Sequence, residues 1–230
     1  MKKLIMTAVV STTFFISSSF AQESSVFLKA GLNLANVSVT DNGSIEEANM
    51  LPSFHIGIQG DLPVTSFLSI QPGLLFGGKG SKTQSGSPSD ASYYKATTNP
   101  FYIEVPVNVV FKAPISKDAK FFAGAGPYAA MGIAGKRKAE GKIFGVSFSS
   151  NDKIDFSNDD PTTSGEEGAG FGILKRFDYG LNGTVGFEGA NTSVSLNYGL
   201  GLAKLQSGSD SGTDNNNKHR VLSFSIGFRL

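Results

Sequence analysis

Residues 101–112 have the sequence Phe-Tyr-Ile-Glu-Val-Pro-Val-Asn-Val-Val-Phe-Lys. Alternate positions from Phe101 to Phe111 are all apolar, whereas the positions between them include Glu104, Asn108 and Lys112. Strict alternation of this length predicts a β-strand with one apolar and one polar face. The apolar face covers about ten residue steps, which rise roughly 25 Å at a tilt of about 40°, the height of the lipid-facing band of a membrane barrel. The stretch therefore predicts a strand that crosses an outer membrane.

The composition fits such a barrel and excludes several other classes of protein. The 230 residues carry a formal net charge of +1, so the strongly basic footprint of a nucleic-acid-binding protein is absent. The chain has no cysteine, which excludes disulfides and thiolate metal sites. Glycine (28 residues) and phenylalanine (19 residues) are frequent, which is typical of many turns and aromatic strands.

The first residues have the pattern of a secretory signal peptide. Lys2 and Lys3 precede a mostly apolar run, and Ser19-Phe20-Ala21 places small residues at the two positions that a signal peptidase reads. We expect residues 1–21 to be a cleaved signal peptide and residues 22–230 to form a single barrel domain. Because no later run of about 18 apolar residues exists, any membrane crossing must use strands.

Seven further stretches alternate in a similar way. With 101–112, the expected strands are 26–37, 54–62, 67–78, 120–135, 174–188, 193–205 and the last residues up to Leu230. The connections between them are alternately long and short, which is typical of long extracellular loops and short periplasmic turns. The longest connection is 136–171. We therefore predict an all-β fold, an eight-stranded antiparallel up-and-down transmembrane β-barrel with both termini in the periplasm.

Alternation alone leaves the direction of the apolar face open. A secreted soluble carrier of the lipocalin type would turn the same face inward. Lipid is favoured because the polar faces carry glycines and charges of both signs, which would fill a narrow lumen and neutralise one another. The expected polar network of the lumen is Lys29, Asp61, Glu104, Lys112, Arg176, Asp178, Glu188 and Arg229.

Two local features lead to further expectations about strands. Pro106 lies inside the expected strand 101–112 and lacks a ladder donor, so we predict a bulge or one missing hydrogen bond there. Tyr93-Tyr94 would either lie at the membrane surface or extend a strand, and the weakly alternating residues 142–149 are a candidate for a strand extension beyond the membrane.

Five segments together resemble the PorT-like outer-membrane β-barrel family of Bacteroidetes, whose members are often called porins. They are Ala-Gly-Leu-Asn-Leu-Ala at 30–35, Gly-Ile-Gln-Gly-Asp at 57–61, Ile-Gln-Pro-Gly-Leu-Leu-Phe at 70–76, Tyr-Ile-Glu-Val-Pro-Val at 102–107 and Gly-Phe-Arg-Leu at 227–230. The resemblance implies a small eight-stranded barrel, and one branch of the family serves protein secretion and gliding. It implies no catalytic residues.

Candidates for chemistry are weak. Residues 73–80 nearly match a phosphate-binding loop, but no Ser or Thr follows Lys79 and no helix is expected after it. His55 and His219 have no ligand spacing, and no acid is placed to orient His219 toward Ser223. We expect no catalytic, cofactor-binding or metal-binding residues and no enzyme activity.

Three hypotheses of function follow, and the first two place the protein in a Gram-negative outer membrane. The first is a closed barrel that displays surface loops for binding or secretion-related interactions, the second is a narrow pore or lateral route for small solutes, and the third is the soluble carrier. The expected partners are outer-membrane lipid and lipopolysaccharide, the outer-membrane assembly machinery, and secretion components or surface ligands. No nucleic acid is expected.

Overall fold

A computed structural model describes residues 24–38, 40–41, 44–45, 50–157, 173–205 and 218–230 of the chain. The expected signal peptide, residues 1–21, lies outside the described residues. Within the described ranges no helix is long and apolar enough to cross a membrane.

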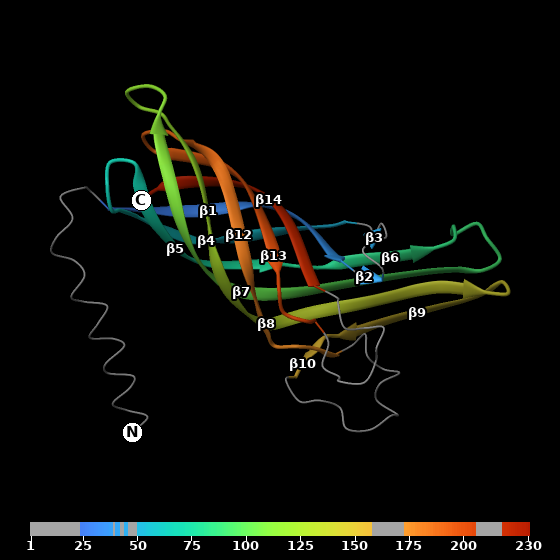
Figure 1. The fold of residues 1–230 in the computed structure, drawn as a ribbon. Helices are drawn as coiled ribbons and strands as arrows, with labels where there is room; N and C mark the ends of the chain where they lie inside the picture. Colours follow the sequence, from blue (N-terminus) through green and yellow to red (C-terminus); the bar gives the residue numbers. More distant parts are fainter. Residues whose placement is uncertain (1–23, 39, 42–43, 46–49, 158–172, 206–217) are drawn as a thin grey trace, which may run out of the picture.

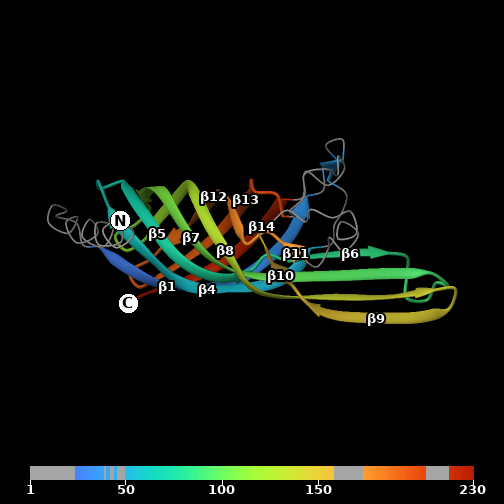
Figure 2. The ribbon, with the colours of Figure 1, turned by 90° about the horizontal axis from the view of Figure 1, so that it is seen from below.

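Among the described strands, eight close into a ring (Figures 1 and 2). These are β1 (Ser25–Ser38), β4 (Leu51–Pro63), β5 (Leu68–Gly78), β7 (Tyr93–Pro114), β8 (Lys120–Ile143), β12 (Phe177–Glu188), β13 (Thr192–Gly201) and β14 (Lys218–Arg229). Their order is β7-β5-β4-β1-β14-β13-β12-β8, every pairing in the ring is antiparallel, and β8 pairs back with β7. The predicted eight-stranded antiparallel barrel is confirmed.

Six shorter strands lie outside the ring. They are β2 (Thr40–Asp41), β3 (Ser44–Ile45), β6 (Ser81–Ser85), β9 (Val146–Lys153), β10 (Asp155–Phe156) and β11 (Ile173–Leu174). Of these, β6 and β9 join the main sheet, so its strand count exceeds eight.

The apolar face of the barrel points outward. On β7, Val105, Val107 and Val109 are between 40% and 47% exposed, whereas Asn108 and Lys112 are 5% and 6% exposed. The other strands of the ring repeat this pattern, with exposed leucine, isoleucine and phenylalanine on the outside. Such an apolar belt is stable in lipid and unfavourable in water. The soluble-carrier hypothesis, which requires the apolar face inside, is therefore wrong.

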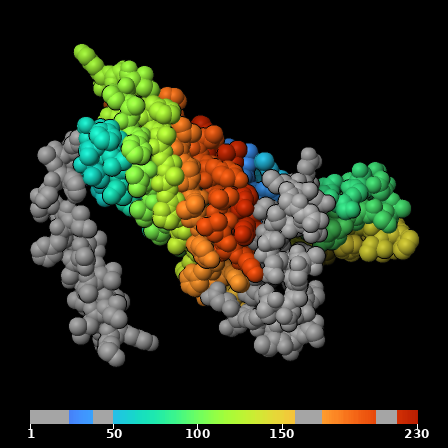
Figure 3. Space-filling view, viewed as in Figure 1, coloured from blue at the N-terminus to red at the C-terminus, as the bar shows by residue number. Residues whose placement is uncertain are grey.

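Two strands of the ring continue beyond one mouth of the barrel. Residues 93–99 of β7 pair with residues 136–142 of β8, while β6 and β9 pair along their outer edges. The resulting four-stranded sheet projects away from the ring on the side opposite the short turns (Figures 1 and 2) and stands clear of the barrel wall in the space-filling view (Figure 3). We call this sheet, residues 81–85, 93–99 and 136–153, the arm. The expected extensions at Tyr93-Tyr94 and 142–149 are both part of it.

Pro106 interrupts the pairing of β7 with β5. The paired positions include Pro72 with Val107 and resume at Leu75 with Glu104, so Pro106 has no paired position on β5. Proline lacks the N–H that the ladder needs, which explains the gap.

The β-bulge of the neighbouring pair lies elsewhere. The register of β7 against β8 shifts between Phe101 and Tyr102. Of the two outcomes predicted at Pro106, the interrupted pairing is therefore the one that is found.

Candidate functional site in the lumen and the arm

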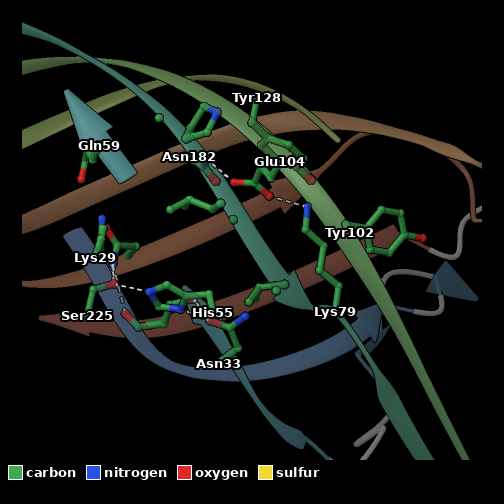
Figure 4. Close-up of a pocket in the computed structure, with 18 of the residues that line it drawn as sticks. Lys29, Asn33, His55, Gln59, Lys79, Tyr102, Glu104, Tyr128, Asn182 and Ser225 are labelled. Atoms are coloured by element: carbon green, nitrogen blue, oxygen red, sulfur yellow. Dashed lines mark hydrogen bonds and ion pairs between the residues drawn. The ribbon is translucent and has the colours of Figure 1, made fainter. Parts of the chain in front are cut away.

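The outer half of the lumen holds a buried cation, Lys79, between two carboxylates; Figure 4 shows its contact with the first of them, Glu104. The Nζ atom of Lys79 lies 2.6 Å from Glu104 Oε2 and 3.0 Å from Asp178 Oδ2, and Lys79 is 7% exposed. Tyr128 donates its hydroxyl to Asp178 at 3.1 Å and offers its ring to Lys79 Nζ at 4.0 Å, while Asn182 donates to Glu104 at 3.2 Å. We call these five residues the outer cluster. Through one ammonium group it links the end of β5 with β7 and β12.

A second buried cation lies near the short turns. Lys112 Nζ is 2.8 Å from Asp61 Oδ2 and 2.5 Å from Glu188 Oε2. Arg229 contacts the other oxygen of Glu188 at 2.9 Å, and Gln71 donates to Asp61 at 3.0 Å. We call these five residues the inner cluster. Because each buried charge has an opposite charge and further hydrogen bonds, the cluster fills the lumen without an unpaired ion.

A separate network of neutral hydrogen bonds lies on the lumen side of β1, β4 and β14. His55 Nδ1 lies 2.7 Å from Asn33 Oδ1, and His55 Nε2 lies 2.9 Å from Ser225 Oγ. Ser223 donates to Asn33 at 2.8 Å. Side chains from β1, β4 and β14 thus hold one another in fixed positions (Figure 4).

A cavity of about 70 Å³ remains beside this network. Its lining includes Lys29, Gln59, Glu104 and Asn108, and Lys29 Nζ lies 3.4 Å from the side-chain oxygen of Asn197. Sites for drug-sized ligands have about 300–1,000 Å³, whereas about 10–15 Å³ is enough for one water molecule. The cavity therefore has room for a few water molecules and none for a larger ligand.

Seven of the eight residues expected in the lumen network lie in or at the rim of the lumen. Asp61, Lys112, Glu188 and Arg229 belong to the inner cluster, Glu104 and Asp178 to the outer cluster, and Lys29 to the cavity.

Arg176 departs from that expectation. Its side chain is exposed and donates to the backbone oxygen of Phe156 at 2.9 Å, because β12 begins one residue later, at Phe177. The placement of Arg176 in the lumen network is wrong.

Lys79 is the residue that sequence reasoning missed. The expected strand 67–78 ends one residue before Lys79, yet Lys79 continues the inward positions Gly73, Leu75 and Gly77 of β5. Extending that period by one step would have found it. The structure does not support a phosphate-binding loop at residues 73–80, because Lys79 contacts two carboxylates.

Buried apolar side chains close the outer mouth. Phe156 on β10 packs edge-on against Tyr102 at a ring distance of 5.8 Å. Ile154, Leu174 and Leu205, each at most 7% exposed, form a cluster beside Phe156. These described residues come from the ends of the long connections, and Phe156 packs beside Tyr102 and Tyr128 next to the outer cluster.

His219 and Ser223, the pair considered for enzyme chemistry, each contact another residue of the lumen. His219 is 1% exposed and lies 3.3 Å from the Tyr102 hydroxyl, while Ser223 is bonded to Asn33. No group of three or more His, Cys, Asp or Glu side chains in the described ranges is placed to hold a metal ion.

On the arm, Glu140 is held by three donors. Its carboxylate lies 2.6 Å from Lys95 Nζ, 2.9 Å from Lys138 Nζ and 3.1 Å from the Tyr93 hydroxyl. These hydrogen bonds, with that from Lys95 the largest, lower the pKa of Glu140 from 4.5 to about 2.

We predict that the arm loses local stability in acid through this carboxylate. Because the folded-state pKa lies below the unfolded value, the contribution is complete above about pH 4.5 and disappears as the pH falls toward 2. Carbon-detected NMR of the Glu140 carboxyl group should show its midpoint near 2. A midpoint at the ordinary value would contradict the three-donor geometry.

The tip of the arm has a strained and exposed aromatic residue. Phe144 has a φ of 48° and is 92% exposed, and Gly145 follows with a φ of 84°. Positive φ at both central residues is typical of a type I′ hairpin turn, in which Asn-Gly is preferred.

We predict that Phe144→Asn stabilises the β8–β9 hairpin by about 1 kcal/mol, because asparagine tolerates the left-handed conformation better than phenylalanine. Amide hydrogen exchange at Ile143 and Val146, which face each other across the turn, should slow roughly fivefold. Unchanged or faster exchange would contradict the strain at this position.

Comparisons with known proteins agree with this architecture. The family model described as "Outer membrane protein beta-barrel domain" matches residues 20–207. None of the curated proteins compared with the chain matches it.

Three solved structures match the chain at low sequence identity. Ail, the attachment invasion locus protein of Yersinia pestis, is 14% identical with a TM-score of 0.40, and Neisserial surface protein A is 13% identical with a TM-score of 0.40. In both comparisons 91% of this chain and 100% of the other are covered. The N-terminal β-barrel domain of Pseudomonas aeruginosa OprF is 9% identical with a TM-score of 0.33, covering 91% and 98%.

Proposed function

Because the chain belongs to the outer membrane protein beta-barrel domain family, we propose that it is a closed outer-membrane barrel that displays the arm and the long loops for binding or secretion-related interactions. The observation that carries this proposal is the filled lumen. The inner cluster, the outer cluster and the apolar residues at the outer mouth block the barrel axis in three places. Transport along the axis would have to break buried ion pairs, whereas display needs only a rigid support.

Conductance in planar lipid bilayers tests whether the barrel is closed. The full-length protein should give no steady unitary current in potassium chloride, since buried ion pairs occupy a narrow lumen at two levels. Lys112→Met/Asp61→Asn/Glu188→Gln is a useful companion variant, because it removes the inner cluster but keeps the outer one. Steady channels in the unmodified protein would contradict the closed barrel and favour the narrow pore.

Surface labelling tests display, because the chain has no cysteine of its own. We propose Ser147→Cys on the arm and Ser116→Cys in the short turn between β7 and β8, both exposed positions. A membrane-impermeant maleimide should label the first in intact cells and the second only after the outer membrane is broken. The reverse pattern would show that the arm faces the periplasm.

One observation favours a second candidate, a lateral route through the wall. Pro72, Pro106 and Pro127 lie on the neighbouring strands β5, β7 and β8, and each lies beside a gap in strand pairing. Gly73 and Pro106 also line the cavity. The wall is therefore short of hydrogen bonds where the lumen has free space.

Hydrogen exchange in lipid nanodiscs separates this candidate from a static wall. A lateral route predicts that the amides of Gly73, Leu74, Val105 and Val107 exchange far faster than those of residues 194–198 in the opposite wall. Equal protection in both walls would remove the lateral route and leave the closed barrel.

The finer assignment to the PorT-like branch is a further proposal, supported by the segments at 70–76 and 102–107. It predicts that cells lacking the gene secrete less protein into the medium, and unchanged secretion would contradict it. The proposal also includes export with removal of residues 1–21, so N-terminal sequencing of the mature protein should begin at Gln22. We propose no enzyme activity, no cofactor and no nucleic-acid partner.

A further inference from the structure

The arm has two unlike faces. On β7, odd-numbered residues from Tyr93 to Phe111 lie on one face, so the outer face of the arm continues the lipid-facing surface of the barrel. Cross-strand pairing adds the matching residues of β6, β8 and β9 to this face. Its charged residues are Lys82, Lys95, Lys136, Lys138, Lys142, Lys153 and Glu140.

The opposite face of the arm is mainly apolar toward its tip. Ile143 pairs with Val146, and Tyr94 stacks against Phe148 at a ring distance of 6.4 Å. The lysines are therefore concentrated on the outer face by the strand period, and they are not spread evenly around the arm.

The positive charge is greatest where the arm leaves the barrel. Lys136 lies directly opposite Lys153, and like charges at opposed positions destabilise a sheet. One step further out, Lys82 and Lys138 both flank Thr97. Among the described residues no carboxylate lies within 4.0 Å of Lys82, Lys136 or Lys153.

The distal part of the same face is closer to neutral. Glu140 lies one step beyond Lys138 and contacts both Lys138 and Lys95. Lys142 donates to the backbone oxygen of Pro88 at 3.1 Å. A soluble polyanion approaching from outside would meet this part first, whereas the uncompensated lysines lie closest to the membrane.

The height of the lysines matches the phosphate layer of the leaflet. Lys136 pairs with Asn99, which lies two residues beyond Phe101 at the upper end of the outward apolar face. Two strand residues span about 7 Å, so the first lysine row lies just above the hydrocarbon. Anionic headgroups attract lysines at that level strongly, each adding about a fivefold gain in binding.

We propose that the base of the outer face of the arm, formed by Lys82, Lys136, Lys138 and Lys153, binds the phosphate groups of lipopolysaccharide in the leaflet that surrounds the barrel. The phosphates supply the negative charge that the opposed pair Lys136–Lys153 lacks. This inference rests on the proposed display of the arm at the cell surface. The proposal assigns a class of ligand to a surface of the arm that takes no part in closing the lumen.

The test measures the affinity of the full-length protein for diphosphoryl lipid A by native mass spectrometry from detergent micelles. Lys136→Gln/Lys153→Gln should weaken binding roughly ten- to thirtyfold. The matched control, Lys117→Gln/Lys142→Gln, removes the same charge from the short turn and the distal arm, and should change binding less than twofold. Lipid A stripped of its phosphates should bind both double variants and the unmodified protein equally weakly.

Three results would overturn the proposal. They are equal weakening in the two double variants, no weakening in either, and a loss of dextran sulfate binding in Lys136→Gln/Lys153→Gln with lipid A binding unchanged. The last result would identify a soluble polyanion as the partner. Failure of the closed barrel is detected separately by conductance and failure of display by Ser147→Cys labelling, neither of which depends on lipid A.

Discussion

Replacing Lys79 by methionine is expected to lower the free energy of unfolding by about 3–5 kcal/mol, because it leaves Glu104 and Asp178 buried without their shared cation. Methionine keeps most of the volume of the lysine side chain, so the loss reports charge and hydrogen bonding. Tyr128 and Asn182 still donate to the two carboxylates, but neutral donors do not replace a positive charge.

The measurement is urea unfolding in lipid vesicles, followed by the gel shift between folded and unfolded barrel. Lys82→Met is the matched control, since Lys82 on β6 contacts no carboxylate among the described residues and should change stability by less than about 0.5 kcal/mol. Lys79→Met/Glu104→Gln/Asp178→Asn should recover much of the loss. A loss in the triple variant as large as in Lys79→Met would show that packing, and not charge, is the cause.

Placing arginine at Val107 is expected to destabilise the folded barrel by about 2–4 kcal/mol in a bilayer, because the side chain then lies near the middle of the lipid-facing band. Val107 is 40% exposed on the outward face of β7, between Val105 and Val109. In the closed barrel the charge has no route into the lumen.

Thr97→Arg is the control for Val107→Arg. Thr97 lies on the same face of the same strand but in the arm, where we expect a change below about 1 kcal/mol. Equilibrium folding into phosphatidylcholine vesicles measures both. Equal effects at the two positions would contradict the placement of Val107 in lipid.

The strands of the ring could be predicted because period-two alternation survives in a single sequence. The run from Phe101 to Phe111 carries enough apolar residues to fix both the strand and its faces, and the structure places them outward and inward as expected. The alternation of long and short connections then fixed the number of strands. Neither inference depends on knowledge of the contacts between side chains.

The arm was harder to predict because both of its faces are partly polar. Beyond Pro100 the sequence of β7 loses its apolar alternation, although hydrogen bonding to β8 continues to Tyr93. A strand stabilised by neighbouring strands rather than by lipid leaves a weaker pattern. Residues 101 and 135, the expected strand ends, therefore mark the edge of the lipid-facing band. The pairing of β7 with β8 continues beyond both.

The partners within the lumen could not be derived from the sequence. Strand faces placed Lys112, Asp61 and Glu188 inside, but the shift between strands around the ring decides which charges meet. The error at Arg176 has a different cause, the expected start of the strand, because Arg176 lies one residue outside β12. The alternation therefore predicts which charged residues point inward, whereas the arrangement of strands in the closed ring determines how these residues group into two clusters.

The central claim is that the apolar face of the barrel lies in lipid while the arm stands outside it. The chain has no tryptophan, so a single introduced tryptophan is an unambiguous fluorescent probe. In vesicles of phosphatidylcholine brominated on its acyl chains, we expect strong quenching for Val107→Trp and almost none for Thr97→Trp, ten residues along the same face of β7. Equal quenching of the two, or protection of Val107→Trp, would contradict the account.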